Sequence, residues 1–284
     1  MWRFVDSKPG DLSATHVIPT RDYVGGVASL GNDVFVLRRR SQNIEVYDAA
    51  TITLQRSFAV PQLGPSSYGL AVCPRNKCIY ASDYHNNSIH RVELKGSNAV
   101  MKWKWSVASK PAGLTVNKAQ NLLVVSNGEC KLQEFTTRGT LLRIIQLQFA
   151  ITGGLWHAID LATGQFVVSC REPWHHVCLV DVNGKVTRSN GVQISSKLSK
   201  MNSPAGLAVD KHENIVVADE MNNRLLVFDR SLTSVHVIPV SVDDGLRAPH
   251  SLWYDKSRGR LCVGEWQGRV VIIDHLVDFT ACQV

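Results

Sequence analysis

The chain has 284 residues, of which 44% are hydrophobic and 19% are charged. This composition excludes a mainly disordered protein, and the length suffices for one large domain or two small ones with a sizeable core. Lys and Arg number 31 against 24 Asp and Glu, and the resulting net charge of +7 permits an acidic partner without requiring one. The sequence has no apolar run long enough to cross a membrane, and it meets charge at Arg3 and Asp6 instead of forming a signal peptide. We therefore predict an intracellular, cytoplasmic protein with no membrane partner.

A pattern of a small residue followed by a short apolar run recurs six times along the chain. Its anchor positions, in chain order, are Gly26, Gly69, Gly113, His157, Gly206 and Ser251. By subtraction of these numbers, successive anchors are 43, 44, 44, 49 and 45 residues apart. A period near 45 residues with four short strands per unit is typical of a propeller blade. We predict an all-β protein, a six-bladed β-propeller of four-stranded antiparallel blades, in a single domain over residues 1–284.

The fifth unit shows the four strands most clearly. Short β-branched runs at 206–209, 215–218, 224–228 and 234–240 are separated by Asn-, Asp- and Glu-containing turns. No segment shows ten or more residues with the period of a helix. Asp83, Asp219 and Glu265 end second strands, where we expect them to accept backbone N–H groups from the following turn.

The ends of the chain supply a candidate for ring closure. The last unit provides three clear strands, and the segment 14–20 precedes the first innermost strand without a blade of its own. We predict that this N-terminal segment forms the fourth strand of the last blade, because the pairing removes an open sheet edge. Segments 2–5 and 277–284 are alternatives.

The cysteines favour a reducing compartment. Seven are present, an odd number at irregular spacings, which is typical of free thiols in an intracellular protein. Cys73 and Cys78 flank a tight turn, so a disulfide across that hairpin is an alternative. Another group gathers in the fourth unit, at Cys170, His175, His176 and Cys178. Thiolates and imidazoles suit zinc, although this spacing matches no standard zinc site and strand residues beside a surface loop are the competing interpretation.

The fifth unit resembles the NHL repeat, which reads Pro-x-Gly-(Ile/Leu)-Ala-Val-Asp, a turn, and Val-x-Asp-x-x-Asn-x-Arg-(Ile/Leu)-x-x-Phe. The residues that fit are Pro204, Gly206, Leu207, Ala208, Val209, Asp210, Val217, Asp219, Asn222, Arg224, Leu225 and Phe228. The second unit fits at Gly69, Leu70, Ala71, Val72, Asp83, Asn86 and Ile89, with Ser88 in place of the Arg. The resemblance implies a six-bladed propeller similar to that of tripartite-motif (TRIM-NHL) proteins and, more distantly, to that of the peptidyl-hydroxyglycine amidating lyase. Absence of Trp-Asp dipeptides argues against the WD40 class.

We expect function where the blades differ, because a residue repeated in every blade has a structural role in each. The loops into the innermost strands and the turns between second and third strands open on one face, where binding residues concentrate. The predicted ligand- or partner-binding residues are Arg21, Tyr23, Arg38, Arg39, Arg40, Tyr68, Tyr84, His85, Lys110, Trp156, His157, Arg171, Trp174, Arg247, His250 and Trp266.

Three functions compete for that face. The first is recognition of a protein or peptide partner, as the resemblance to substrate-selecting propellers of tripartite-motif ubiquitin ligases implies; no zinc-finger spacing encodes a RING here. The second is binding of single-stranded RNA, which needs positive charge beside aromatic planes. The third is lyase chemistry.

The amidating lyase that this chain resembles carries zinc on three His, one in every second blade. His250 within Pro249-His250 matches that pattern, His157 lies one residue late behind Trp156, and Tyr68 stands where the third His belongs. His157 and His250 are thus the metal-ligand candidates. Because the set is incomplete, we expect no catalytic residue and no cofactor, with zinc or calcium as alternatives.

Overall fold

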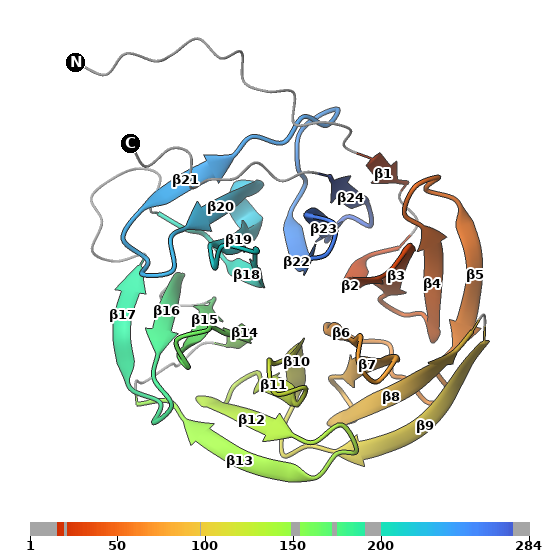
Figure 1. The fold of residues 1–284 in the computed structure, drawn as a ribbon, viewed down its shortest axis with the longest axis horizontal. Helices are drawn as coiled ribbons and strands as arrows, with labels where there is room; N and C mark the ends of the chain where they lie inside the picture. Colours follow the sequence, from red (N-terminus) through yellow and green to blue (C-terminus); the bar gives the residue numbers. More distant parts are fainter. Residues whose placement is uncertain are drawn as a thin grey trace.

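The computed structural model describes residues 16–19, 22–96, 98–148, 154–171, 175–190 and 200–274 (Figure 1). They form six four-stranded sheets around a central axis, each with antiparallel strands. The first two blades are β2 (Val24–Leu30), β3 (Asp33–Arg38), β4 (Asn43–Asp48) and β5 (Leu54–Ala59), then β6 (Leu70–Cys73), β7 (Cys78–Asp83), β8 (Ser88–Lys95) and β9 (Asn98–Ser106). The prediction of a six-bladed propeller is confirmed.

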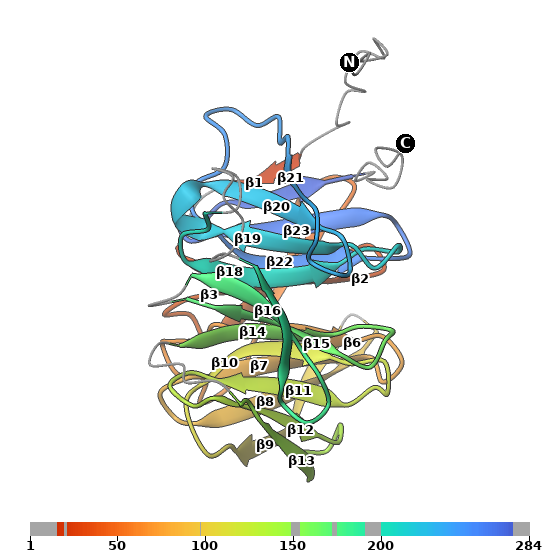
Figure 2. The same ribbon diagram turned by 90° about the vertical axis from the view of Figure 1, so that its left-hand side faces the viewer.

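The next three blades follow at successive levels in the side view, where β20 lies above β16 and β16 above β12 (Figure 2). Blade three comprises β10 (Pro111–Val116), β11 (Leu122–Ser126), β12 (Lys131–Phe135) and β13 (Leu141–Gln146). Blade four comprises β14 (Leu155–Asp160), β15 (Phe166–Cys170), β16 (His176–Val180) and β17 (Val186–Asn190). Blade five comprises β18 (Pro204–Val209), β19 (Ile215–Asp219), β20 (Arg224–Phe228) and β21 (Val235–Ile238), close to the strands predicted from its sequence.

The N-terminal strand closes the ring. Blade six contains β22 (Pro249–Asp255), β23 (Arg260–Glu265) and β24 (Val270–Ile273), and β1 (His16–Ile18) pairs antiparallel with β24 as its fourth strand. Val17 lies opposite Val271, and Ile18 is fully buried between blades six and one. The prediction for segment 14–20 is therefore confirmed over its described residues. The alternatives, 2–5 and 277–284, lie outside the described part.

Among the described residues the apolar core has six clusters between neighbouring blades, one at each junction, and a seventh formed by Ala112, Trp156 and Ala205. Innermost strands approach so closely that an added side chain would collide: a Cβ on Gly26 would lie 2.6 Å from Leu70 Cβ, and one on Gly206 would lie 2.7 Å from His250 O. The anchor glycines of the repeat are thus explained by crowding around the axis.

The acidic residues at the ends of second strands brace the loops. Asp219 accepts the backbone N–H of Asn202 at 2.7 Å, and Glu265 accepts that of Arg247 at 2.7 Å. Asp83 accepts from Gly64 at 3.0 Å and from Asn86 at 3.3 Å. The predicted role is therefore found, but most donors lie in the connection from the preceding blade, not in the following turn.

Two further sequence-based expectations concern cysteines and membranes. Cys73 pairs in register with Cys78 across their hairpin, and both are buried free thiols, so the disulfide alternative is not formed. In the described part of the chain there is no helix of the length and apolarity needed to cross a bilayer.

Candidate functional site

One cluster of aromatic and basic side chains lies where innermost strands begin and second strands end. We call it the aromatic mouth, and its members are Tyr23, Arg39, Tyr68, Tyr84, Trp156, Arg171, His250 and Trp266. They come from blades one, two, four and six, at positions 23–266 of the chain, so only closure of the ring brings them together. Eight of the sixteen predicted site residues thus meet in one place.

Three rings form the floor of the mouth, and we call them the ring plug: Tyr68, Trp156 and His250. Their ring centroids lie 5.3 Å (Tyr68–Trp156), 5.1 Å (Trp156–His250) and 6.5 Å (Tyr68–His250) apart. Trp156 and His250 are nearly fully buried. They come from alternate blades, and small residues occupy the corresponding positions of the blades between, Gly25, Ala112 and Ala205. Alternation of large and small side chains lets three rings meet where six would not fit.

Irregularities in strand pairing set the orientation of two residues of the ring plug. In blade four the register jumps between Leu155 and His157, and in blade six between Pro249 and Ser251, so Trp156 and His250 have no partner on the second strand. Such bulges redirect a side chain from the sheet face. Ser169 Oγ forms hydrogen bonds with backbone groups beside the irregularity in blade four. It accepts from His157 N at 3.1 Å and donates to Ala205 O at 2.7 Å.

Two arginines lie over the aromatic rings. The guanidinium carbon of Arg39 lies 4.6 Å from the centroid of Trp266 and 4.9 Å from that of Tyr68, and Arg39 Nη2 donates to Tyr68 Oη at 3.0 Å. Arg171 lies 4.5 Å above Trp156. Trp266 is also stacked on Tyr68 at 6.3 Å and contacts Tyr23 at 5.5 Å. Each cation–π contact of this kind contributes about 0.5–2 kcal/mol, so the cluster is held in one arrangement.

A buried carboxylate joins the mouth from blade five. Glu220 Oε1 accepts from Arg171 Nη2 at 2.7 Å, and Glu220 Oε2 lies 2.7 Å from His250 Nδ1. Burial raises the pKa of Glu220, but hydrogen bonds from His250 and Arg171 and the charge of Arg171 outweigh it and hold that pKa below its ordinary value. Burial lowers the pKa of His250 despite Glu220. Neutral His250 therefore donates Nδ1–H to Glu220, and its buried Nε2 has no hydrogen-bond partner among the described residues.

His157, the other metal candidate, lies in the channel and braces blades. Its Nδ1 accepts the backbone N–H of Leu207 at 3.0 Å, and its Nε2 lies 3.1 Å from both Leu114 O and Thr115 Oγ1. Burial lowers the pKa of His157 to about 4, so the ring is neutral and both nitrogens are occupied. Among the described residues, neither His157 nor His250 belongs to a set of three candidate metal ligands.

The remaining predicted residues lie outside the cluster or at its rim. Arg38 is buried, donating to Glu45 Oε2 at 3.0 Å and to the carbonyls of Asp22 and Gly268, so it ties blade one to blade six. Lys110 lies 5.5 Å from the Tyr84 ring, and exposed His85 contacts the same ring. Arg40 is exposed, and Arg247 is exposed and paired with Asp244. Arg21 and Trp174 lie outside the described residues.

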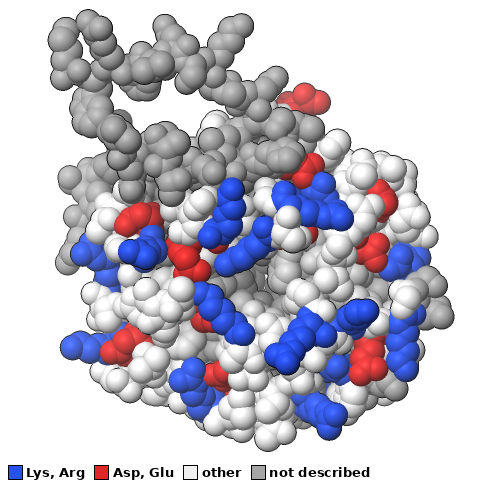
Figure 3. Space-filling model, viewed as in Figure 1, with Lys and Arg blue, Asp and Glu red and all other residues white. Residues whose placement is uncertain are grey.

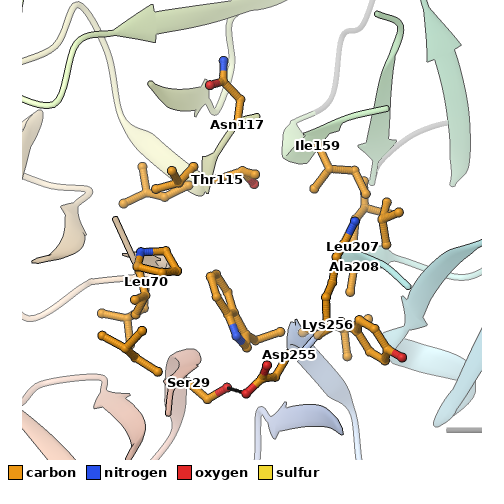
Figure 4. Close-up of a pocket in the computed structure, with 18 of the residues that line it drawn as sticks. Ser29, Leu70, Thr115, Asn117, Ile159, Leu207, Ala208, Asp255 and Lys256 are labelled. Atoms are coloured by element: carbon orange, nitrogen blue, oxygen red, sulfur yellow. Dashed lines mark hydrogen bonds between the residues drawn. The ribbon is translucent and has the colours of Figure 1, made fainter. Parts of the chain in front are cut away.

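A funnel of about 500 Å³, which no pattern in the sequence predicts, opens at the other end of the channel. Figure 4 shows residues from inner strands and their turns around it, including Leu70, Ile159 and Leu207, with Ser29 Oγ donating to Asp255 Oδ2 at 3.5 Å. Lys118 and Lys256 also line it. Along the ring axis, Lys and Arg side chains surround the central hollow (Figure 3). From their positions in the repeat, these residues could be predicted only as turn formers, so the sequence did not indicate a cavity.

Comparison with known proteins agrees with the fold. The NHL repeat family matches residues 201–228, so blade five carries an NHL repeat. No curated protein matches the chain. Among solved structures, streptogramin B lyase is 12% identical with a TM-score of 0.66, covering 91% of this chain and 97% of that one. A protein of unknown function from Bacteroides thetaiotaomicron is 15% identical with a TM-score of 0.70, covering 89% and 69%. Catalytically inactive virginiamycin B lyase from Staphylococcus aureus with quinupristin is 12% identical with a TM-score of 0.64, covering 93% and 90%. At these identities the likeness shows the fold alone.

Proposed function

We propose that the aromatic mouth is a recognition site for a peptide segment of a protein partner, with an anionic group of that segment seated beside Arg39. The observation that carries this proposal is the convergence of rings from four blades beneath Arg39 and Arg171. NHL propellers often bind proteins, and aromatic and Arg residues are the usual anchors of such interfaces. In the manner of tripartite-motif ubiquitin ligases, the chain would supply the substrate-recognition step.

The charge balance of the mouth favours an anionic ligand group. Glu220 already neutralises Arg171, whereas Arg39 and Lys110 have no carboxylate partner among the described residues. A carboxylate beside Arg39 would form charge-assisted hydrogen bonds in a half-buried setting.

The same contacts disfavour single-stranded RNA. Base stacking requires bare ring faces, but Arg39 covers Trp266 and Tyr68, and Arg171 covers the nearly buried Trp156. RNA binding therefore serves as an opposing outcome of the test.

The test selects peptides from a displayed random library on the wild-type chain, with depletion on the Arg39→Ala variant. The selected peptides should be enriched in Asp, Glu or a free carboxyl terminus. Arg39→Ala should weaken their binding at least about tenfold, equivalent to about 1.4 kcal/mol, as measured by calorimetry. Arg40→Ala is the matched control, because Arg40 is adjacent and exposed but outside the cluster. Equal losses in the two variants, or tighter binding to U-rich and A-rich oligonucleotides than to any peptide, would contradict the proposal.

A lyase-type reaction is the second candidate, favoured by the Glu220–His250 pair. A neutral imidazole oriented by a carboxylate and carrying an unpartnered Nε2 is suited to accept a proton. Turnover of quinupristin or of a peptidyl-hydroxyglycine that disappears in His250→Ala would support it. No turnover of either substrate by the wild type would count against it.

A further inference from the structure

A second cluster of reactive side chains lies between blades three and four. Cys170 ends β15, and His176 and Cys178 lie on β16, where His176 is the register partner of Cys170. All three side chains are buried, and their ligand atoms lie within 4.8 Å of one another. Cys130 packs against the same apolar cluster from blade three. This cluster takes no part in the aromatic mouth.

The pairing of the two strands explains why these three side chains meet. Residues two apart on a strand point to the same face, so His176 and Cys178 share a face of β16. Cys170 lies directly opposite His176 and diagonally from Cys178, within reach of both. The sequence spacing matches no standard zinc motif because the third ligand comes from a neighbouring strand across a turn.

The chemistry of the three side chains favours metal binding. Thiolate sulfur and imidazole nitrogen are ligands that Zn²⁺ prefers in proteins, and here two sulfurs and one imidazole already lie within 4.8 Å of one another. A bound dication would displace the protons of both thiols.

We propose that Cys170, His176 and Cys178 form a structural zinc site. Zn–S bonds of about 2.3 Å and Zn–N bonds of about 2.0–2.1 Å place tetrahedral ligand atoms roughly 3.5 Å apart, so side-chain shifts of about 1 Å suffice. Two thiolates and a neutral imidazole around Zn²⁺ have no net charge, which suits an apolar surrounding. Binding releases the two thiol protons of Cys170 and Cys178, and a water molecule completes the tetrahedron.

The site would fix one part of the aromatic mouth. Arg171 directly follows Cys170 in the chain and contacts Trp156 and Glu220. His175 directly precedes His176, and its Nδ1 accepts the backbone N–H of Ser203 at 3.0 Å, so it contacts blade five. A metal bound to Cys170 and His176 would hold Arg171 over Trp156.

The test measures metal in the full chain purified under reducing conditions. Elemental analysis should find about one zinc ion per chain, and Co²⁺ exchanged into the site should give the near-ultraviolet thiolate-to-cobalt absorption. Cys178→Ser should lose both signals, and chelation should lower the Tm of the wild type but not of this variant. Cys78→Ser is the matched control, because Cys78 is a buried thiol facing Cys73 across a hairpin in blade two.

Several outcomes would overturn the proposal. The first is a wild-type chain that neither retains zinc nor shows the cobalt absorption. The second is equal zinc loss in the two variants. The third is a mass spectrum showing Cys170 and Cys178 joined as a disulfide under reducing conditions. The cobalt spectrum needs only the wild type, so a Cys178→Ser chain that fails to fold still leaves the proposal falsifiable.

Discussion

Replacement of Glu220 by Gln should destabilise the protein in a way that depends on pH. In the native protein Glu220 accepts charge-assisted hydrogen bonds from Arg171 and His250, each at 2.7 Å. Such bonds contribute about 1.5–3 kcal/mol each, and Gln can still accept one of them as a neutral group. Because Arg171 is partly exposed, we expect Glu220→Gln to lower the free energy of unfolding by about 2–3 kcal/mol at neutral pH.

The corresponding change in melting temperature can be measured by calorimetry. An unfolding entropy of about 2.1 cal/mol/K per residue gives roughly 0.6 kcal/mol/K for this chain, so the Tm should fall by about 4 °C. Glu213→Gln is the control: Glu213 is paired at 3.1 Å with the more exposed Lys118, and loss of its charge should cost less than about 1 kcal/mol.

The pH dependence gives the sharper criterion. The pKa of Glu220 is lowered in the folded state, so its contribution is complete above the ordinary pKa of a Glu, about 4.3, and is lost as pH falls through the folded value. The gap between wild type and Glu220→Gln should therefore be constant near pH 7 and close below about pH 4. A gap equal to that of Glu213→Gln, or one that persists unchanged in acid, would refute this account.

Two other predictions concern the ring as a whole. Ile18→Ala should lower the free energy of unfolding by about 2–5 kcal/mol, because fully buried Ile18 closes the junction between blades six and one. The control Val17→Ala, on the exposed face of β1, should cost less than about 1 kcal/mol in the same chemical denaturation experiment, and equal losses in the two variants would exclude closure by β1. Burial lowers the pKa of His157 to about 4, so the folded state disfavours the proton on His157, and the stability of the wild type should decline as pH falls from about 6.5 to about 4. The decline should be smaller in His157→Gln, and parallel declines in the two proteins would contradict the role of neutral His157 in bracing the blades.

The repeat determined how much of the fold could be predicted. A 45-residue period and β-branched runs located the blades, and an unpaired segment before the first blade predicted the closing strand that β1 provides. The loop register also placed Tyr68, Trp156 and His250 on one face, and in the structure their rings lie against one another. Local sequence was sufficient because each blade repeats the same short-range pairing.

The details of the site could not be predicted in the same way. Arg38, Arg39 and Arg40 are consecutive, yet one is buried between blades, one covers the rings and one is exposed, because strand β3 ends within the run. The turn carrying Glu220 gave no sign that its carboxylate would reach His250 in the next blade. Such pairings join residues that are 30 or more positions apart in the chain, and no local pattern in a single sequence indicates them.

The ring plug connects this propeller to metal chemistry in a testable way. Tyr68, Trp156 and His250 occupy the alternate-blade positions at which the predicted resemblance to the amidating lyase implies three His. Three imidazoles on one zinc ion have ring centroids about 5 Å apart, given Zn–N bonds of about 2 Å, and the plug centroids lie 5.1, 5.3 and 6.5 Å apart.

The Tyr68→His/Trp156→His double variant should therefore create a three-His site that takes up a metal ion. Made in the Cys178→Ser background, it should bind about one Co²⁺ per chain with visible d–d bands and without thiolate absorption, whereas Cys178→Ser alone should not. Its control is Tyr84→His/Trp156→His, in which the first His replaces an aromatic residue of the mouth outside the plug. If both double variants bind cobalt equally, or if neither does while both remain folded, the three plug positions do not converge as the ring distances indicate. Binding by the first alone would mean that two substitutions separate an aromatic recognition floor from a metal centre on the same scaffold.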